Sequence, residues 1–270
     1  MPLETIDQPN VQQLAIERPL KKRKKVFDLK RDVTESDVER IMRRLYALVE
    51  TRDLFKFFRS AAGIKLLYPE LRKEITGMLI QTDVEHIREQ VRDTSNMFDL
   101  RAPAFMHIFS PSLLERNIIE RYWSIEFPKI NTSDLFRLEL SALLKIVFPD
   151  REPLLGLDEE FRKRVYAEII DEQVDKNQRL VRAMYYRILF PNRKDDFGFR
   201  DNAKDFVATQ LENARRENRW GQFSQLLFQL GIVFADEVRF IDGELAVHFD
   251  TKEKKFDESA SSPLPAKLKF

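Results

Sequence analysis

Residues 135–148 read LFRLELSALLKIVF, and this stretch decides the class of the fold. Its apolar residues cover most of the circumference of a helix, as expected for a helix that other helices surround. Asn131, Thr132 and Ser133 stand just before it, and their side chains are typical N-terminal caps. We therefore expect a central core helix here, within a mainly α protein.

Rows of apolar residues at helical spacing continue on both sides of this helix. Residues 34–37 provide caps for an amphipathic helix that we expect to end near residues 59–63. A second amphipathic stretch follows Pro69, and a shorter helix follows Pro111. The later rows are Phe161, Val165 and Ile169; Leu180, Met184 and Ile188; Phe206, Val207 and Leu211; and Phe223, Leu226, Leu227 and Leu230.

The composition also favours helices. The chain of 270 residues has 7 Gly and 12 Pro, so few residues suit the positive φ angles of tight β turns. It has no Cys, which excludes a disulfide framework, a thiol nucleophile and a zinc site with Cys ligands. No apolar run approaches the roughly 18 residues that span a bilayer, and the N-terminus lacks a secretory pattern. We expect no membrane insertion and a cytoplasmic location, or a nuclear one in a eukaryotic host.

The C-terminal part of the body changes character around Asp242-Gly243. Residues 237–241 and 244–249, EVRFI and ELAVHF, are rich in β-branched and aromatic residues. An Asp-Gly pair between two such runs predicts a β-hairpin, because both residues tolerate positive φ. With the helix expected over residues 219–230, the hairpin resembles the second half of a winged-helix domain. Its acidic wing favours a version that binds protein over one that reads DNA. The alternative is a hairpin that merely covers the end of the helical core.

Two segments, KIVFPDREPLLGLDEEF (145–161) and RILFPNRKDDFGFRDNA (187–203), align at an offset of 42 residues. Tyr68-Pro69 is a weaker relative of their shared aromatic-Pro step. One interpretation is a helical-hairpin repeat of the HEAT or armadillo kind. The other is a common helix stop, since proline disfavours helical geometry in the residue before it. Two good copies do not reach the roughly three that a solenoid needs, so we favour an irregular multi-helix domain.

The net charge of +1 conceals a basic arm. Residues 18–31 hold eight basic residues and one Asp, a net +7, so the remainder of the chain sums to −6. The arm's candidate contact residues are Lys21, Lys22, Arg23, Lys24, Lys25, Lys30 and Arg31. With Pro19 before it, the run 21–25 resembles a nuclear import signal, and the same composition binds nucleic-acid phosphates by releasing counterions. A solvated tail with no specific reader is the alternative.

Two further groups are candidate contacts. Phe55, Phe57 and Phe58 are so close in sequence that a helix cannot turn all three the same way. We therefore consider an exposed apolar patch for a partner, beside a simple core role. Arg215, Arg216 and Arg219 precede the C-terminal unit and are candidates for a secondary basic contact with nucleic acid.

Motifs for catalysis are missing from the sequence. No two of the three His residues have the i, i+4 spacing of a helical metal site. There is no Gly-rich phosphate loop and no G-x-S-x-G nucleophile elbow. We therefore expect no catalytic residues, no metal and no cofactor.

We expect a disordered arm over residues 1–32, a helical domain over 33–198, helices with the hairpin over 199–249, and a flexible tail over 250–270. The favoured function is a non-enzymatic adaptor or subunit that binds other proteins through aromatic-rich surfaces, with homo-oligomers also compatible. The first alternative is a DNA- or RNA-binding regulator that uses the arm and the C-terminal unit. The second is an enzyme that lacks a recognisable motif.

Overall fold

The computed structural model confirms a mostly helical fold that ends in an antiparallel hairpin. It describes residues 33–79, 101–113, 115–130, 133–191, 197 and 203–249, together with Leu29, Asp83, Glu85, His86 and Glu89. The helices are α2 (Glu35–Glu50), α3 (Leu54–Leu67), α4 (Arg72–Gly77), α6 (Arg101–Phe109), α7 (Arg116–Glu126), α8 (Asp134–Val147), α9 (Glu159–Ile170), α10 (Lys176–Leu189), α11 (Ala203–Arg216) and α12 (Trp220–Phe234). The 3-10 helices are η1 (Pro69–Leu71), η2 (Pro111–Leu113), η3 (Phe127–Ile130) and η4 (Pro149–Leu155), and the strands are β1 (Glu237–Ile241) and β2 (Glu244–His248).

Helices begin where the sequence supplies caps. Thr34 and Asp37 form a capping box at α2, in which each side chain accepts a hydrogen bond from the backbone N–H of the other residue. Ser133, Asp158 and Asp175 cap α8, α9 and α10 through side chains that accept from backbone N–H groups of the first turn. The expected starts of α2 and α8 are confirmed.

The expectation that the first helix continues to residues 59–63 is wrong. It ends at Glu50, and Arg52 then adopts a left-handed φ of 54°. Asp53 caps the new helix α3, its carboxylate accepting a hydrogen bond from the Lys56 backbone N–H at 3.3 Å. The apolar spacing is helical on both sides of the turn, so the pattern did not reveal the break.

Helix α6 has no counterpart among the expected helices. Its Pro103 falls in the first turn, where a backbone N–H has no partner within the helix and proline is tolerated. Met106, Ile108 and Phe109 on this helix are buried. Among the described residues, no helix has the length and apolar character needed to cross a membrane.

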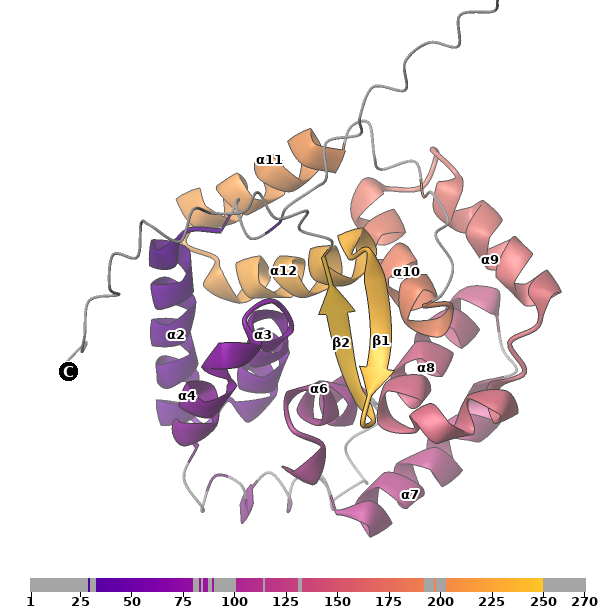
Figure 1. Cartoon of the computed structure of the whole chain (residues 1–270), viewed down its shortest axis with the longest axis horizontal. Helices are drawn as coiled ribbons and strands as arrows, with labels where there is room; N and C mark the ends of the chain where they lie inside the picture. The colour runs from indigo at the N-terminus through magenta and orange to yellow at the C-terminus, as the bar shows by residue number, and fades with distance from the viewer. Residues whose placement is uncertain are drawn as a thin grey trace, which may run out of the picture.

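The most buried of the described helices pack in a closed circuit. Helix α3 packs against α6, α6 against α8, α8 against α10, α10 against α12, and α12 against α3. In Figure 1 these helices lie around the hairpin, while α2, α7, α9 and α11 lie toward the periphery. Residues 140–147 of α8 are all buried, which confirms the expected core helix over its C-terminal half. In the first turn of α8, Phe136 is exposed and its neighbours Leu135 and Arg137 are half-buried.

Helices α3 and α12 approach closely because small residues face each other. Gly63 lies so near α12 that a Cβ there would overlap the backbone oxygen of Ser224. The fully buried hydroxyl of Ser224 donates a hydrogen bond to the backbone oxygen of Ser60. At Gly231, a Cβ would lie 3.2 Å from the side chain of Leu67. The closure of the circuit therefore depends on residues with little or no side chain.

The 42-residue echo marks equivalent ends of neighbouring helices in the circuit. Phe148 after α8 has φ −132° and ψ 65°, and Phe190 after α10 has φ −119° and ψ 61°. Tyr68 after α3 matches them, with φ −130° and ψ 68°. Each precedes a proline, which explains why each helix stops there. Most of the second copy beyond Pro191 lies outside the described residues.

Each of these three ends also holds a buried cation three residues before the aromatic residue. The cations are Lys65, Lys145 and Arg187. Lys65 donates to the backbone oxygen of Ile108, Lys145 to that of Leu189 at 2.8 Å, and Arg187 to that of Ala235 at 2.7 Å. These oxygens lie at the C-terminal ends of α6, α10 and α12, where carbonyls lack helical partners and carry partial negative charge. Each cation thus caps the next helix of the circuit.

The hairpin turns at Asp242 and Gly243, as expected, with φ angles of 52° and 80°. Glu244 on β2 forms ion pairs with Lys65 at 2.7 Å and with Arg72 at 3.1 Å. Burial by itself would raise the pKa of Glu244, but the two cations outweigh it and the pKa is lowered. The hairpin is therefore held against α3 and α4 by a charged carboxylate.

Candidate partner-binding groove

An open, mainly apolar groove of about 500 Å³ lies between the first half of α8 and one face of α10. It is lined by Leu135, Phe136, Leu138, Glu139, Asn177, Gln178, Val181, Arg182 and Tyr185. Helical periodicity explains the α10 wall, because Asn177, Val181 and Tyr185 are four residues apart and share a face. The two walls are held together by Lys145 of α8, which donates to the last carbonyl of α10.

Phe136 gives the groove its exposed aromatic surface. This side chain is 44% exposed, whereas Leu138 on the same wall is buried. Leu135 and Val181 are half-buried. The exposed ring, bordered by polar side chains, makes the groove a candidate contact surface.

The carboxylate that lines the groove is already occupied. Glu139 accepts hydrogen bonds from Arg101 Nε at 2.6 Å and from Tyr185 Oη at 3.0 Å. Burial, together with the negative charge of Glu139, raises the pKa of Tyr185. Tyr185 therefore stays a neutral hydrogen-bond donor, and the charge of Glu139 is balanced by Arg101.

Arg182 provides a positive charge at the groove. Within the part of the chain that the structure describes, its guanidinium makes no hydrogen bond or ion pair. Asn177 and Gln178 are exposed beside it and offer amide donors and acceptors. The groove thus combines an apolar surface with the positive charge of Arg182, which has no counterion among the described residues.

The groove offers amide, guanidinium, carboxylate and phenol groups. Its hydroxyl belongs to Tyr185, whose raised pKa makes it a poor nucleophile. Across the described residues, no group of three or more His, Asp or Glu side chains is placed to hold a metal ion.

The apolar patch expected at Phe55, Phe57 and Phe58 is wrong for two of its members. Phe57 and Phe58 are 0% and 1% exposed, and their rings pack edge to face at 5.3 Å. Both also contact the ring of Phe109 on α6. Phe55 alone of the three is at the surface, 38% exposed, because the turn of the helix directs it away from the core.

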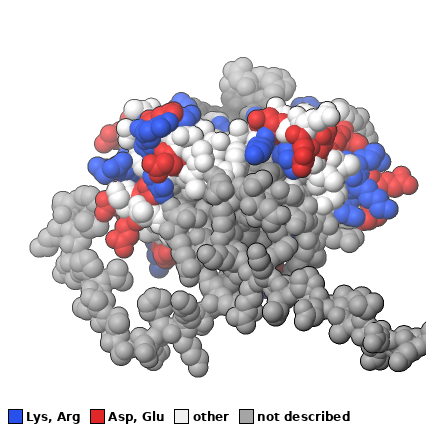
Figure 2. Space-filling model, turned by 90° about the horizontal axis from the view of Figure 1, so that it is seen from above, with Lys and Arg blue, Asp and Glu red and all other residues white. Residues whose placement is uncertain are grey.

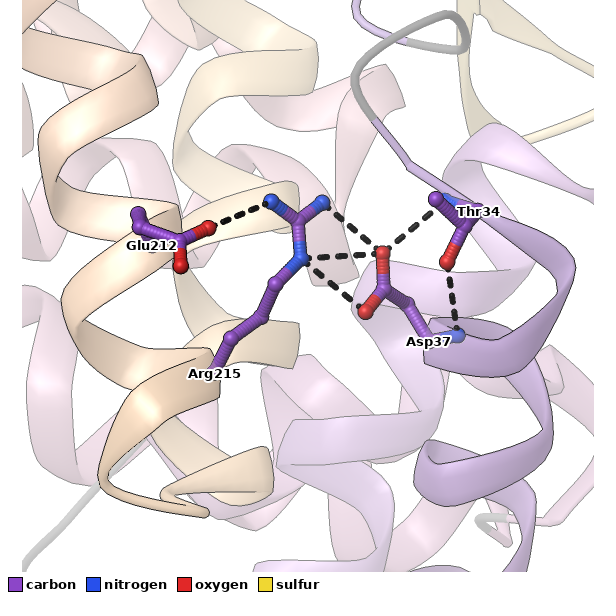
Figure 3. Close-up of polar contacts among 4 residues, drawn as sticks. All are labelled: Thr34, Asp37, Glu212 and Arg215. Atoms are coloured by element: carbon purple, nitrogen blue, oxygen red, sulfur yellow. Dashed lines mark hydrogen bonds and ion pairs between the residues drawn. The ribbon is translucent and has the colours of Figure 1, made fainter.

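Arg215, expected as part of a secondary basic contact, is engaged within the molecule (Figure 3). Its Nη2 lies 2.8 Å from Oδ2 of Asp37, and its Nε lies 3.0 Å from Oδ1. Nη1 pairs with Glu212 at 3.3 Å, and the guanidinium lies over the ring of Phe223. Because Asp37 belongs to the capping box of α2, this ion pair ties α11 to the start of α2. The charge of Arg215 is balanced and is not offered to a phosphate.

The other two arginines are at the surface. Arg216 donates to the side chain of Asn213 at 3.3 Å, and Arg219 pairs with Glu217 at 2.7 Å. On the described part of the face in Figure 2, Lys and Arg side chains are interspersed with Asp and Glu. Two of the three arginines thus already face carboxylates, which weakens the case for a joint phosphate site.

Helix α12 holds the place that a recognition helix would take before the wing. It is buried almost throughout residues 223–233, against α3, α10 and α11. Beyond its first turn, a helix buried in this way has little surface to insert into a DNA groove. The basic-arm residues Lys21 to Lys25, Lys30 and Arg31, and the tail over 250–270, lie outside the described residues.

The Asp37–Arg215 pair predicts a pH dependence of stability. Burial alone would raise the pKa of Asp37, but the hydrogen bonds from Arg215 and Thr34 outweigh it and the pKa is lowered. A carboxyl whose pKa is lower in the folded than in the unfolded protein stabilises the fold at pH values above its unfolded pKa, near 3.8. This stabilisation is lost as the pH falls through the folded pKa. We expect the difference in unfolding free energy between wild type and D37N to be larger at pH 6 than at pH 3, measured by urea denaturation. An equal difference at both pH values would contradict the pairing.

Sequence reasoning missed the groove. Its clearest signal is the spacing of Asn177, Val181 and Tyr185, which places them on one face of a helix. The sequence does not show that this face meets the first turns of α8, nor that Phe136 points out of the core helix. Comparisons of the chain with family models, characterised proteins and solved structures find no match.

Proposed function

We propose that this chain is a non-enzymatic adaptor or structural subunit that binds a partner protein through the groove between α8 and α10. The observation that carries the proposal is the exposed ring of Phe136 in a mainly apolar groove. Aromatic side chains that fill a partner's pocket often dominate the binding energy of an interface.

The walls of the groove support this role because they are held in place before a partner arrives. Lys145 joins α8 to α10, and Arg101 and Tyr185 fix Glu139 between α6, α8 and α10. A surface that is already ordered loses less conformational entropy on binding. The groove is therefore better suited to a lasting contact than a mobile loop would be.

Replacing Phe136 with aspartate is expected to reduce partner binding at least tenfold, because it removes the aromatic anchor and adds a charge. The full chain, wild type or F136D, would be purified with an affinity tag from its native host. Co-purifying proteins would then be quantified by mass spectrometry. At least one abundant protein should be recovered with wild type and depleted with F136D.

F55D is the matched control. Phe55 is also exposed and lies in the first turn of a helix of the circuit, but it does not line the groove. Retained binding in F55D supports the groove. Loss of binding in F55D with retention in F136D would move the partner site to α3. An unchanged set of partners with both variants would contradict the proposal.

The basic arm supports a second candidate function, contact with nucleic acid or an import receptor. Its net charge of +7 is the observation in its favour. The described residues of α11 and the turn after it add little free positive charge to that of the arm, because Arg215 and Arg219 are already paired with carboxylates. We therefore assign this function to the arm by itself and not to a composite site with α11.

A further inference from the structure

The charge balance of the groove restricts what can fill it. Glu139 is bonded to Arg101 and Tyr185, so it is not available to a basic partner. Arg182 has no counterion among the described residues. A partner with a carboxylate would supply one, whereas a partner with Lys or Arg at this point would place two like charges together.

The shape of the groove sets the size of the occupant. Its α10 wall runs from Asn177 to Tyr185, which at roughly 1.5 Å per residue is about 12 Å, or two turns of a helix. A partner helix of that length presents apolar side chains at i and i+4 on one face, with room for an acidic residue beside them. Those apolar side chains would meet Phe136 and Val181.

We infer that the groove binds an acidic amphipathic helix of a partner protein, with its apolar face on Phe136 and Val181 and a carboxylate on Arg182. This inference rests on the groove being the partner site, as proposed above. Nucleic acid fits less well, because its backbone would bring several phosphates to a groove in which Arg182 is the one cation without a counterion among the described lining residues. Nucleic acid also supplies no aliphatic side chain for Val181.

The probe is a peptide selected for this groove. Random 12-residue peptides displayed on phage would be selected on the full wild-type chain and counter-selected on F136D. The best binder would be synthesised with a fluorophore and titrated by anisotropy. We expect selected peptides to share an Asp or Glu within four residues of a Leu or an aromatic residue. We also expect replacement of that acidic residue by its amide to weaken binding several-fold.

R182E should weaken binding of the acidic peptide about tenfold, and a peptide with Lys at the acidic position should recover binding to R182E. K163E is the control, since Lys163 is an exposed cation on α9 that does not line the groove. It should leave binding unchanged, and circular dichroism would verify that both variants are folded.

The outcomes separate this inference from the proposed function. Peptides that need Phe136 but are basic, or are insensitive to R182E, would overturn the acidic partner and leave the groove as the binding site. Failure to select any peptide that distinguishes wild type from F136D would count against both.

Discussion

Replacing Gly63 with alanine is expected to destabilise the protein by about 3 kcal/mol, as overpacking of a closely packed helix pair does. The added Cβ would overlap the backbone oxygen of Ser224, and a backbone atom cannot rotate away as a flexible side chain can. Helix propensity favours alanine by only about 1 kcal/mol, so the steric clash decides the sign. Urea denaturation followed by circular dichroism would measure the change.

Gly77 provides the matched control for this substitution. It is also in a helix, at the end of α4, and a Cβ there would meet no atom within 4 Å. G77A should change the unfolding free energy by less than about 0.5 kcal/mol or raise it slightly. Equal effects of G63A and G77A would contradict the close approach of α3 and α12.

Replacing Asp37 with alanine is expected to lower the unfolding free energy by about 2–3 kcal/mol. The substitution removes the capping box of α2 and leaves Arg215 without its main counterion, although Glu212 remains nearby. Arg215 is 25% exposed, so water compensates part of the loss. Chemical denaturation at pH 7 would test the expectation.

E35A is the control, because Glu35 is an exposed acidic residue in the same first helical turn. It should cost no more than about 0.5 kcal/mol, since it shares the interaction with the helix dipole but not the ion pair. A double-mutant cycle with R215A isolates the pair, and an interaction energy near zero would show that α11 is not tied to α2 in this way.

Gly63 and Asp37 stabilise different contacts between helices of the fold. Gly63 allows α12 to close the circuit on α3, and Asp37 fastens the peripheral helix α11 to the start of α2. Neither residue lines the groove between α8 and α10. Measurements of stability and of partner binding can therefore be interpreted separately.

Elements of the fold could be predicted where the signal is local. The row Phe161, Val165 and Ile169 predicts a helix, and all three side chains are fully buried. The Asp-Gly turn and the caps at Thr34 and Ser133 were likewise visible, because each involves residues within a few positions of one another. The break between α2 and α3 at Arg52 could not be predicted, because arginine is not a residue type that marks a left-handed turn.

The candidate site was less accessible to sequence reasoning. Phe55, Phe57 and Phe58 formed the most conspicuous aromatic cluster, yet two of them are core residues, while Phe136 lay unnoticed in a helix expected to be enclosed. Arg215 is paired with Asp37, which lies 178 positions away in the sequence. The exposure of a side chain and its ion-pair partner depend on which helices pack together. The local sequence pattern contains no information about that packing.

By itself, the sequence determined the helical class, the C-terminal hairpin and the places where α8 and α10 end before a proline. These follow from short-range backbone preferences and from apolar periodicity. Only the tertiary structure decided that Lys65, Lys145 and Arg187 cap the next helices of the circuit, and that Arg182 keeps an unpaired charge among the described residues. The physical reason is that the rotation and register of packed helices depend on contacts between residues far apart in the chain, such as Gly63 and Ser224.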